Sequence, residues 1–161
     1  MKYFLGLLIA TLPMAAQADG LPTQKVLSLD AAQLIVQGAI EKCRSGGHKV
    51  SVVVIDPSNT LKAFGRDDGA SLGTVQMAQA KAYSVVAFGR ATGPRDDQPV
   101  GTPPPLSGMT NAAGGLPIMV GDQLLGAVAV SGVKSVKGEP GAEKDVACAN
   151  AGLERAANLL K

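Results

Sequence analysis

Two pairs of short apolar runs, each pair joined by turn residues, constrain the fold of this chain most. Each pair predicts a β-hairpin, because strands joined by so short a turn pair antiparallel. The first hairpin comprises Val50–Ile55 and Leu61–Phe64 across Asp56-Pro57-Ser58-Asn59, and the second comprises Leu116–Val120 and Leu124–Ser131 across Gly121-Asp122-Gln123. The chain is therefore expected to contain an antiparallel sheet.

Helical patterns precede, separate and follow the hairpins. The first begins at Ser28, a favoured N-cap residue, keeps apolar residues at helical spacing to Cys43 and stops at Gly46-Gly47. The other two cover Ser71–Arg90 and Glu139–Leu160. This order lacks the regular strand–helix alternation of a doubly wound parallel sheet. The predicted fold class is α/β in the broad sense, and α+β more closely, with helices packed on an antiparallel sheet.

The segment Ser71–Arg90 has apolar or small residues nearly all round the predicted helix. A helix without a polar face is buried on two sides. In so small a domain, we expect the second side to contact another subunit.

The N-terminus has the three parts of an export signal in the right order. Lys2 supplies a positive charge, Phe4–Leu12 is a short apolar run, and Ala16-Gln17-Ala18 fits a cleavage site. The alternative is a buried N-terminal helix. We expect residues 1–18 to be a signal peptide and residues 19–161 to form a single domain that is periplasmic or secreted.

Cys43 and Cys148 are the two cysteines of the chain. In an oxidising compartment they would form a disulfide, which stabilises a small domain. The alternative is two buried free thiols, since the sequence does not give the separation of their Cα atoms.

The sequence lacks the residue patterns of several common catalytic and metal sites. His48 is the single histidine, so a Ser–His–acid triad would have to use it, and we expect it at the surface where a strand begins. The chain has no H-E-x-x-H, C-x-x-C or G-x-S-x-G motif. The net charge is +2 without a basic run, so neither nucleic acid nor a membrane is an expected partner. No catalytic residue is predicted.

Lys81 is the one charge between Ser71 and Phe88, and Ser84 shares its face of the helix. Together they could bind a carboxylate or a metal-bound ligand. The alternative is a lysine that reaches solvent along the helix and a hydroxyl bonded to its own backbone.

Arg66 and Gly114-Gly115 are the other candidate ligand-binding positions. Arg66 could bind an anion with both arms of its guanidinium, or pair with an aspartate at the strand end. The two glycines end the long segment Ala91–Gly115, which has no regular period. They could offer backbone N–H groups to an anion, or form a tight turn.

Five short motifs and the start of the final helix follow one another over roughly residues 26–160: Val53-Val54-Ile55-Asp56, Arg66-Asp67-Asp68-Gly69-Ala70, Ala78-Gln79-Ala80-Lys81-Ala82, Gly114-Gly115-Leu116-Pro117-Ile118, Gly126-Ala127-Val128-Ala129-Val130-Ser131-Gly132 and Asp145-Val146-Ala147-Cys148-Ala149. In sequence and in order they resemble the GlcG/HbpS family, which also includes the C-terminal domain of PduO-type proteins.

The resemblance implies a profilin-like domain, an antiparallel sheet of about five strands flanked by three main helices, that assembles into homo-oligomers. It also implies that the chain binds haem or a related tetrapyrrole, and haem degradation is known in some members. Ser84 aligns with a threonine implicated in haem contact, which makes it a candidate metal contact. Met109 and Met119 are further candidate haem ligands, because thioethers can ligate haem iron.

Three functions follow as hypotheses. The first is an exported small-molecule-binding protein, for haem or a related tetrapyrrole, that acts as a homo-oligomer. The second is an enzyme or enzyme accessory acting on a small hydroxy or oxo acid, with Lys81 and Arg66 binding the carboxylate. The third is a structural assembly partner in the periplasm, with the apolar second helix as its interface.

Overall fold

The computed structural model describes residues 20, 23–95, 106–136 and 140–161. The expected signal peptide, its cleavage site and the three prolines at 103–105 lie outside the described residues. The elements in order are α1 (Leu29–Ser45), β1 (Ser51–Ile55), β2 (Leu61–Arg66), α2 (Gly73–Phe88), β3 (Gly115–Val120), β4 (Gln123–Ser131), α3 (Gly141–Ala156) and a 3-10 turn, η1 (Ala157–Leu159).

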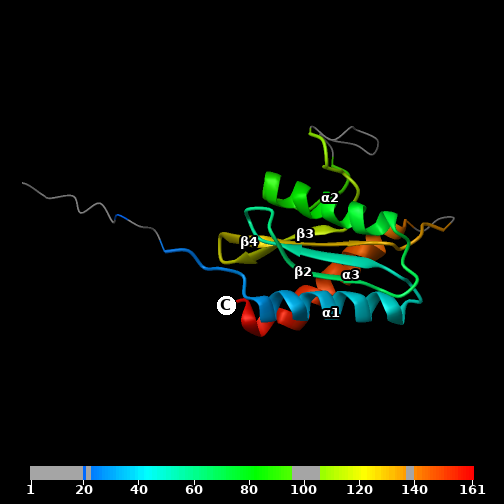
Figure 1. Ribbon diagram of the computed structural model, residues 1–161, viewed down its shortest axis with the longest axis horizontal. Helices are drawn as coiled ribbons and strands as arrows, with labels where there is room; N and C mark the ends of the chain where they lie inside the picture. Colours follow the sequence, from blue (N-terminus) through cyan, green and yellow to red (C-terminus); the bar gives the residue numbers. More distant parts are fainter. Residues whose placement is uncertain (1–19, 21–22, 96–105, 137–139) are drawn as a thin grey trace, which may run out of the picture.

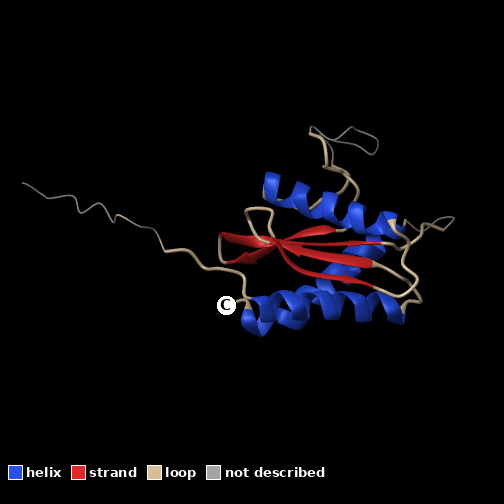
Figure 2. Cartoon of the chain, viewed as in Figure 1, coloured by secondary structure: helices blue, strands red, loops and turns tan. Residues whose placement is uncertain are grey.

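The sheet is antiparallel throughout, and its strand order is β2-β1-β4-β3. Both predicted hairpins are present, and β1 and β4 form the centre of the sheet. α2 covers one face of the sheet, and α1 and α3 cover the other (Figures 1 and 2). The α+β class with three main helices is confirmed.

The expectation of about five strands was one too high for the described residues, where the sheet has four. Its outer strand β3 contains Pro117, which has no backbone N–H to donate. Proline is tolerated in edge strands and not in central ones, which fits β3 as the edge of the sheet.

α1 begins and ends where the sequence predicts. The Ser28 hydroxyl oxygen accepts a hydrogen bond from the backbone N–H of Ala31 at 3.2 Å. The helix ends at Gly46, and Gly47 follows with a φ of 75°, a conformation that glycine adopts without strain. Local capping chemistry therefore sets both ends of this helix.

α1 and α3 pack closely and are joined covalently. A disulfide links Cys43 to Cys148, with the Cα atoms 5.5 Å apart, so the bridge and not the pair of free thiols is present. Gly152 on α3 allows the close approach: a Cβ there would lie 2.4 Å from the carbonyl oxygen of Ile35 on α1. Helix α3 runs from 141 to 156 rather than the predicted 139 to 160.

α2 buries one side in the single chain. Its inner side, with Ala78, Ala82 and Val85, packs on Val53 and on small residues of β4. Its ends and outer side expose apolar side chains: Leu72, which precedes the helix, Met77 and Phe88. The expectation that another subunit covers this outer side stays a prediction. Among the described residues, no helix is long and apolar enough to cross a membrane.

Candidate functional site

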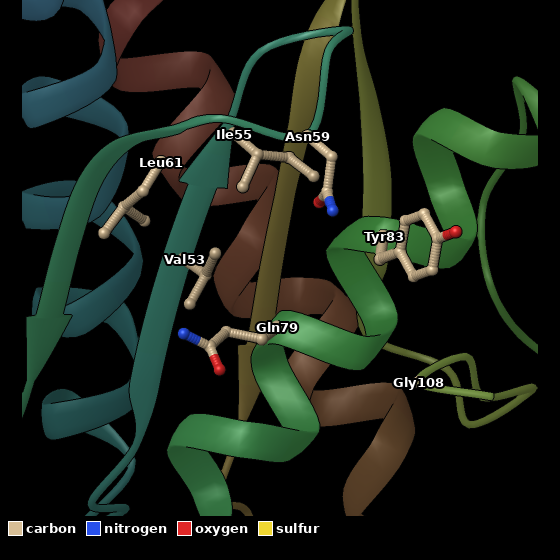
Figure 3. Close-up of a pocket in the computed structure, with 7 residues that line it drawn as sticks. All are labelled: Val53, Ile55, Asn59, Leu61, Gln79, Tyr83 and Gly108. Atoms are coloured by element: carbon tan, nitrogen blue, oxygen red, sulfur yellow. The ribbon is translucent and has the colours of Figure 1, made fainter.

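A groove opens where the first hairpin extends beyond the cover of α2. We call it the hairpin groove, and it is lined by Val53, Ile55, Asn59, Leu61, Gln79, Tyr83 and Gly108 (Figure 3). Its volume is about 260 Å³. α2 packs chiefly on β4 and β1, so the edge strand β2 leaves Leu61 and Phe64 about half exposed. The walls therefore combine three apolar side chains with two amides and a phenol.

A second groove adjoins the first along the outer side of α2. This methionine groove has a volume of about 480 Å³ and is lined by Gly73, Gln76, Met77, Gln79, Ala80, Gly108, Met109 and Thr110. Gln79 and Gly108 line both grooves, so the two grooves are neighbours. The pair of grooves thus combines one phenol with two thioethers, groups that can ligate haem iron.

Ser84 connects α2 to the loop that borders these grooves. Its hydroxyl donates to the carbonyl oxygen of Ala80 at 2.9 Å and accepts from the backbone N–H of Thr110 at 2.9 Å. The side chain is buried. Ser84 therefore holds residues 108–110 against α2, and its proton is already used by the helix.

Lys81 points inward from α2 and forms a buried ion pair. Its Nζ lies 2.9 Å from Asp145 Oδ2 and 2.7 Å from the carbonyl oxygen of Val130. The other oxygen of Asp145 accepts from the backbone N–H of Val133. Burial holds the pKa of Lys81 below its usual value and raises the pKa of Asp145, while their mutual attraction opposes both shifts.

Neither interpretation of Lys81 drawn from the sequence included Asp145 as its partner. The ammonium does not reach solvent, since Lys81 is only 2% exposed. Its charge is balanced by a carboxylate of the chain itself, which leaves it poorly suited to bind the carboxylate of a ligand.

Gly114 passes directly over the ion pair, and Gly115 packs on the neighbouring part of α2. A Cβ at Gly114 would lie 2.6 Å from Lys81 Nζ, and one at Gly115 would lie 2.9 Å from a methyl carbon of Val85. The N–H of Gly115 donates to the Thr92 hydroxyl, and Thr92 donates back to Gly115. Close packing over Lys81 thus explains both glycines, and the N–H of Gly115 is already bonded.

Arg66 lies at the end of β2 and takes no part in this cluster. Its guanidinium donates to the carbonyl oxygen of Ala70 and closes the turn after the strand. The arginine–aspartate pair at this end of the strand is instead Arg44 with Asp67, at 2.7 Å. β1 lies between β2 and β4, so roughly 10 Å separates the strand of Arg66 from the strand whose carbonyl Lys81 binds.

The remaining ligand candidates lie apart. His48 is half-buried in the loop before β1 and lines two other grooves, which share no lining residue with the hairpin groove. Met119 is exposed on β3, whereas Met109 is buried in the methionine groove. Within the described part of the chain, no group of three His, Cys, Asp or Glu residues could hold a metal ion.

Sequence reasoning missed Tyr83 and Asp145. The sequence does contain a signal for Tyr83, because it is the single tyrosine after residue 18. Asp145 stands in the final-helix motif of the family, but its lysine partner is 64 residues away and not indicated by any local pattern.

Solved structures share this fold over nearly their whole length. A double mutant of Streptomyces reticuli HbpS is 29% identical, with a TM-score of 0.73 over 93% of this chain and 98% of that chain. Klebsiella pneumoniae ORFY is 20% identical, with a TM-score of 0.73 over 88% and 98%. A PduOC–haem complex is 21% identical, with a TM-score of 0.68 over 81% and 95%.

No curated protein matches the chain. A family model does, over residues 27–154, and its description is haem degrading protein HbpS-like. This match covers most of the chain and confirms the resemblance drawn from the motifs. The chain belongs to the HbpS-like family.

Proposed function

We propose that this protein binds haem or a related tetrapyrrole in the hairpin groove, where Tyr83 would hold the iron. The observation that carries the proposal is the lining of the groove: Tyr83 borders it together with the apolar residues Val53, Ile55 and Leu61, in a chain that matches the family model described as haem degrading protein HbpS-like. Phenolate is one of the axial ligands that proteins use for haem.

The residues of the hairpin groove suit a haem in two respects. Val53, Ile55 and Leu61 offer apolar surface for a macrocycle, and Tyr83 offers an oxygen donor. The described lining of the two grooves includes no cation, so the propionates would face solvent. Bound haem would supply a redox-active iron that no side chain of the protein provides.

The surrounding residues would position the ligand. Ser84 holds Thr110 and its loop against α2, which keeps Gly108 and Met109 beside Gln79. Figure 3 shows Gln79 extending from α2 toward Val53 on β1, and both residues line the groove. Met109 lies in the adjoining groove, and its thioether is a further group that could contact the iron.

The test is a haem titration of the protein produced from Asp19 onward, followed by its Soret band. We expect a shifted band that saturates at one haem per chain. Ser84→Ala should weaken binding without changing the band position, because Ser84 supports the loop and does not ligate. A spectrum equal to that of free haem at the same concentration would refute the proposal.

Export is the second part of the proposal. The signal-like N-terminus and the Cys43–Cys148 disulfide support it, because disulfides persist in oxidising compartments. The whole chain should be expressed in a bacterium with a periplasm. Mass spectrometry of the periplasmic fraction should give a mature chain that begins at Asp19. Recovery of the chain with Met1 in the cytoplasm would contradict this.

Assembly into a homo-oligomer is the third part. The apolar side chains of Met77 and Phe88 on the outer side of α2 support it. Light scattering should give a multiple of the chain mass, and Phe88→Glu should shift the protein toward monomer. A monomer at micromolar concentration would refute the assembly.

A small hydroxy or oxo acid as the ligand has less support. Lys81 on α2 is paired with Asp145, and Arg66 at the end of β2 is bonded to Ala70 in the turn that follows. These two cations therefore do not converge on one carboxylate.

A further inference from the structure

The end of the domain around His48 carries a concentration of positive charge. Two grooves meet at His48, with volumes of about 370 and 380 Å³. One is lined by His48, Lys49 and Lys134, and the other by Lys42, His48 and Lys144. We call these five residues the basic end. They come from the last turn of α1, the loop before β1, the segment after β4 and the first half of α3.

The carboxylates near the basic end already have cationic partners. Asp67 binds Arg44 closely, and its second oxygen lies 3.8 Å from Lys49. Asp145 is buried with Lys81. Among the described residues, no Asp or Glu lines either groove, and Lys42 and Lys134 form no ion pair. Lys49 therefore has Asp67 as a partner, whereas the charges of Lys42 and Lys134 are not balanced by an ion pair within the described part of the chain.

One groove also exposes backbone. Gly47 and Gly69 line it with positive φ values of 75° and 82°, and a Cβ at either would meet nothing within 4 Å. Ser71 adds a hydroxyl to the same wall. A ligand can thus reach the main chain here without a side chain in the way.

We propose that the basic end binds a small anion with two or more phosphate groups, one group in each groove on either side of His48. Lysine ammonium groups bind phosphate as point charges, and two groups held at once give more affinity than one. This site shares no residue with the hairpin groove, so the proposal does not depend on haem binding.

The probe is inorganic pyrophosphate, titrated by calorimetry into the protein produced from Asp19 onward at constant ionic strength. We expect saturable binding at one site per chain. Lys42→Gln and Lys134→Gln should each weaken it roughly tenfold, which corresponds to losing about one charge-assisted hydrogen bond. Amide NMR shifts should centre on Gly47, His48 and Lys49.

Lys25→Gln is the matched control. It removes the same charge from an exposed position before α1, and α1 is 17 residues long, which places it roughly 25 Å from the basic end. Binding should be unchanged in this variant. Both substituted lysines of the basic end are exposed, so their variants should unfold at the wild-type temperature.

Four results would overturn the proposal. They are absence of saturable binding, equal weakening by Lys25→Gln, equal affinity for orthophosphate and pyrophosphate, and tighter binding of citrate than of pyrophosphate. Equal weakening by Lys25→Gln would mean that the net charge of the protein alone attracts the anion. Equal affinity for orthophosphate and pyrophosphate would mean that at most one groove binds a phosphate group. Tighter binding of citrate would mean that the site prefers carboxylates.

Discussion

Lys81 and Asp145 join the two faces of the sheet: Nζ on α2 lies 2.9 Å from Oδ2 on α3, across 64 residues of sequence. The pair passes the end of β4, where the carbonyl of Val130 and the N–H of Val133 complete its hydrogen bonds. Gly114 leaves the space above it. This arrangement ties together segments that no single layer of the fold connects.

Replacing one partner of the Lys81–Asp145 pair should lower stability more than replacing both. Lys81→Met leaves a buried carboxylate without a cation, and we expect the free energy of unfolding to fall by about 3–5 kcal/mol. The double variant Lys81→Met/Asp145→Leu should recover most of that loss, because neither charge is then buried alone. Urea denaturation measures both, with Lys25→Met as an exposed control. If the single variant lost less than about 1 kcal/mol of unfolding free energy, the pair would contribute no more than an exposed ion pair does, which would contradict the prediction.

The disulfide should stabilise the domain through the long chain segment that it closes. Cys43 and Cys148 are 105 residues apart, for which chain entropy predicts up to about 4.7 kcal/mol, and native bridges commonly deliver about 2–4. The Cys43→Ala/Cys148→Ala variant should lose stability in this range in guanidinium denaturation. Reductant should destabilise the wild type and leave this variant unchanged. Equal effects of reductant on both proteins would contradict the prediction.

Contact between α1 and α3 should be sensitive to a single methyl group. Gly152→Ala places a Cβ 2.4 Å from the carbonyl oxygen of Ile35, so we expect a loss of about 1–3 kcal/mol. Gly73→Ala is the matched control, because its Cβ on α2 would meet nothing within 4 Å. Thermal unfolding compares the two variants. Similar melting temperatures for the two variants would show that α1 and α3 can move apart to admit a methyl group without a loss of stability.

The sequence predicts the elements of this fold well where the signal is local. Ser28 and Gly47 mark the ends of α1, and the residues Asp56 to Asn59 form the turn between β1 and β2. Capping, turn and period depend on neighbours within a few residues, so one sequence suffices to read them.

The site was less predictable because it depends on contacts between distant segments. Nothing near Lys81 indicates that Asp145 will neutralise it, and nothing near Tyr83 indicates that β2 leaves a groove open beside it. The Ser84 hydroxyl donates to Ala80 on its own helix, which was the alternative drawn from the sequence, but its contact with the backbone of Thr110 is not indicated by any local pattern.

Asp67 should make stability depend on pH in the acid range. The Arg44 guanidinium, by hydrogen bond and charge, holds the pKa of Asp67 below its ordinary value of 3.8. Folding therefore favours the ionised carboxyl. The stabilisation is complete above the ordinary value and is lost as the pH falls through the lower, folded-state value.

The check compares wild type with Asp67→Asn by urea denaturation between pH 7 and pH 3. The difference in unfolding free energy should be largest at neutral pH and shrink below about pH 4. Lys62→Gln, a change on β2 away from this pair, should leave the pH profile unaltered. A constant difference across the range would show that the Asp67 charge does not contribute.

The central claim is that Tyr83 ligates haem in the hairpin groove, and the most direct measurement is resonance Raman spectroscopy of the haem-loaded protein. Produced from Asp19 onward, the protein has Tyr83 as its single tyrosine, so a phenolate–iron signal has one possible source. We predict that signal in the wild type and in His48→Ala, and its loss in Tyr83→Phe together with the shifted Soret band. A wild-type spectrum without the phenolate signal, or a Tyr83→Phe spectrum identical to wild type, would contradict the account.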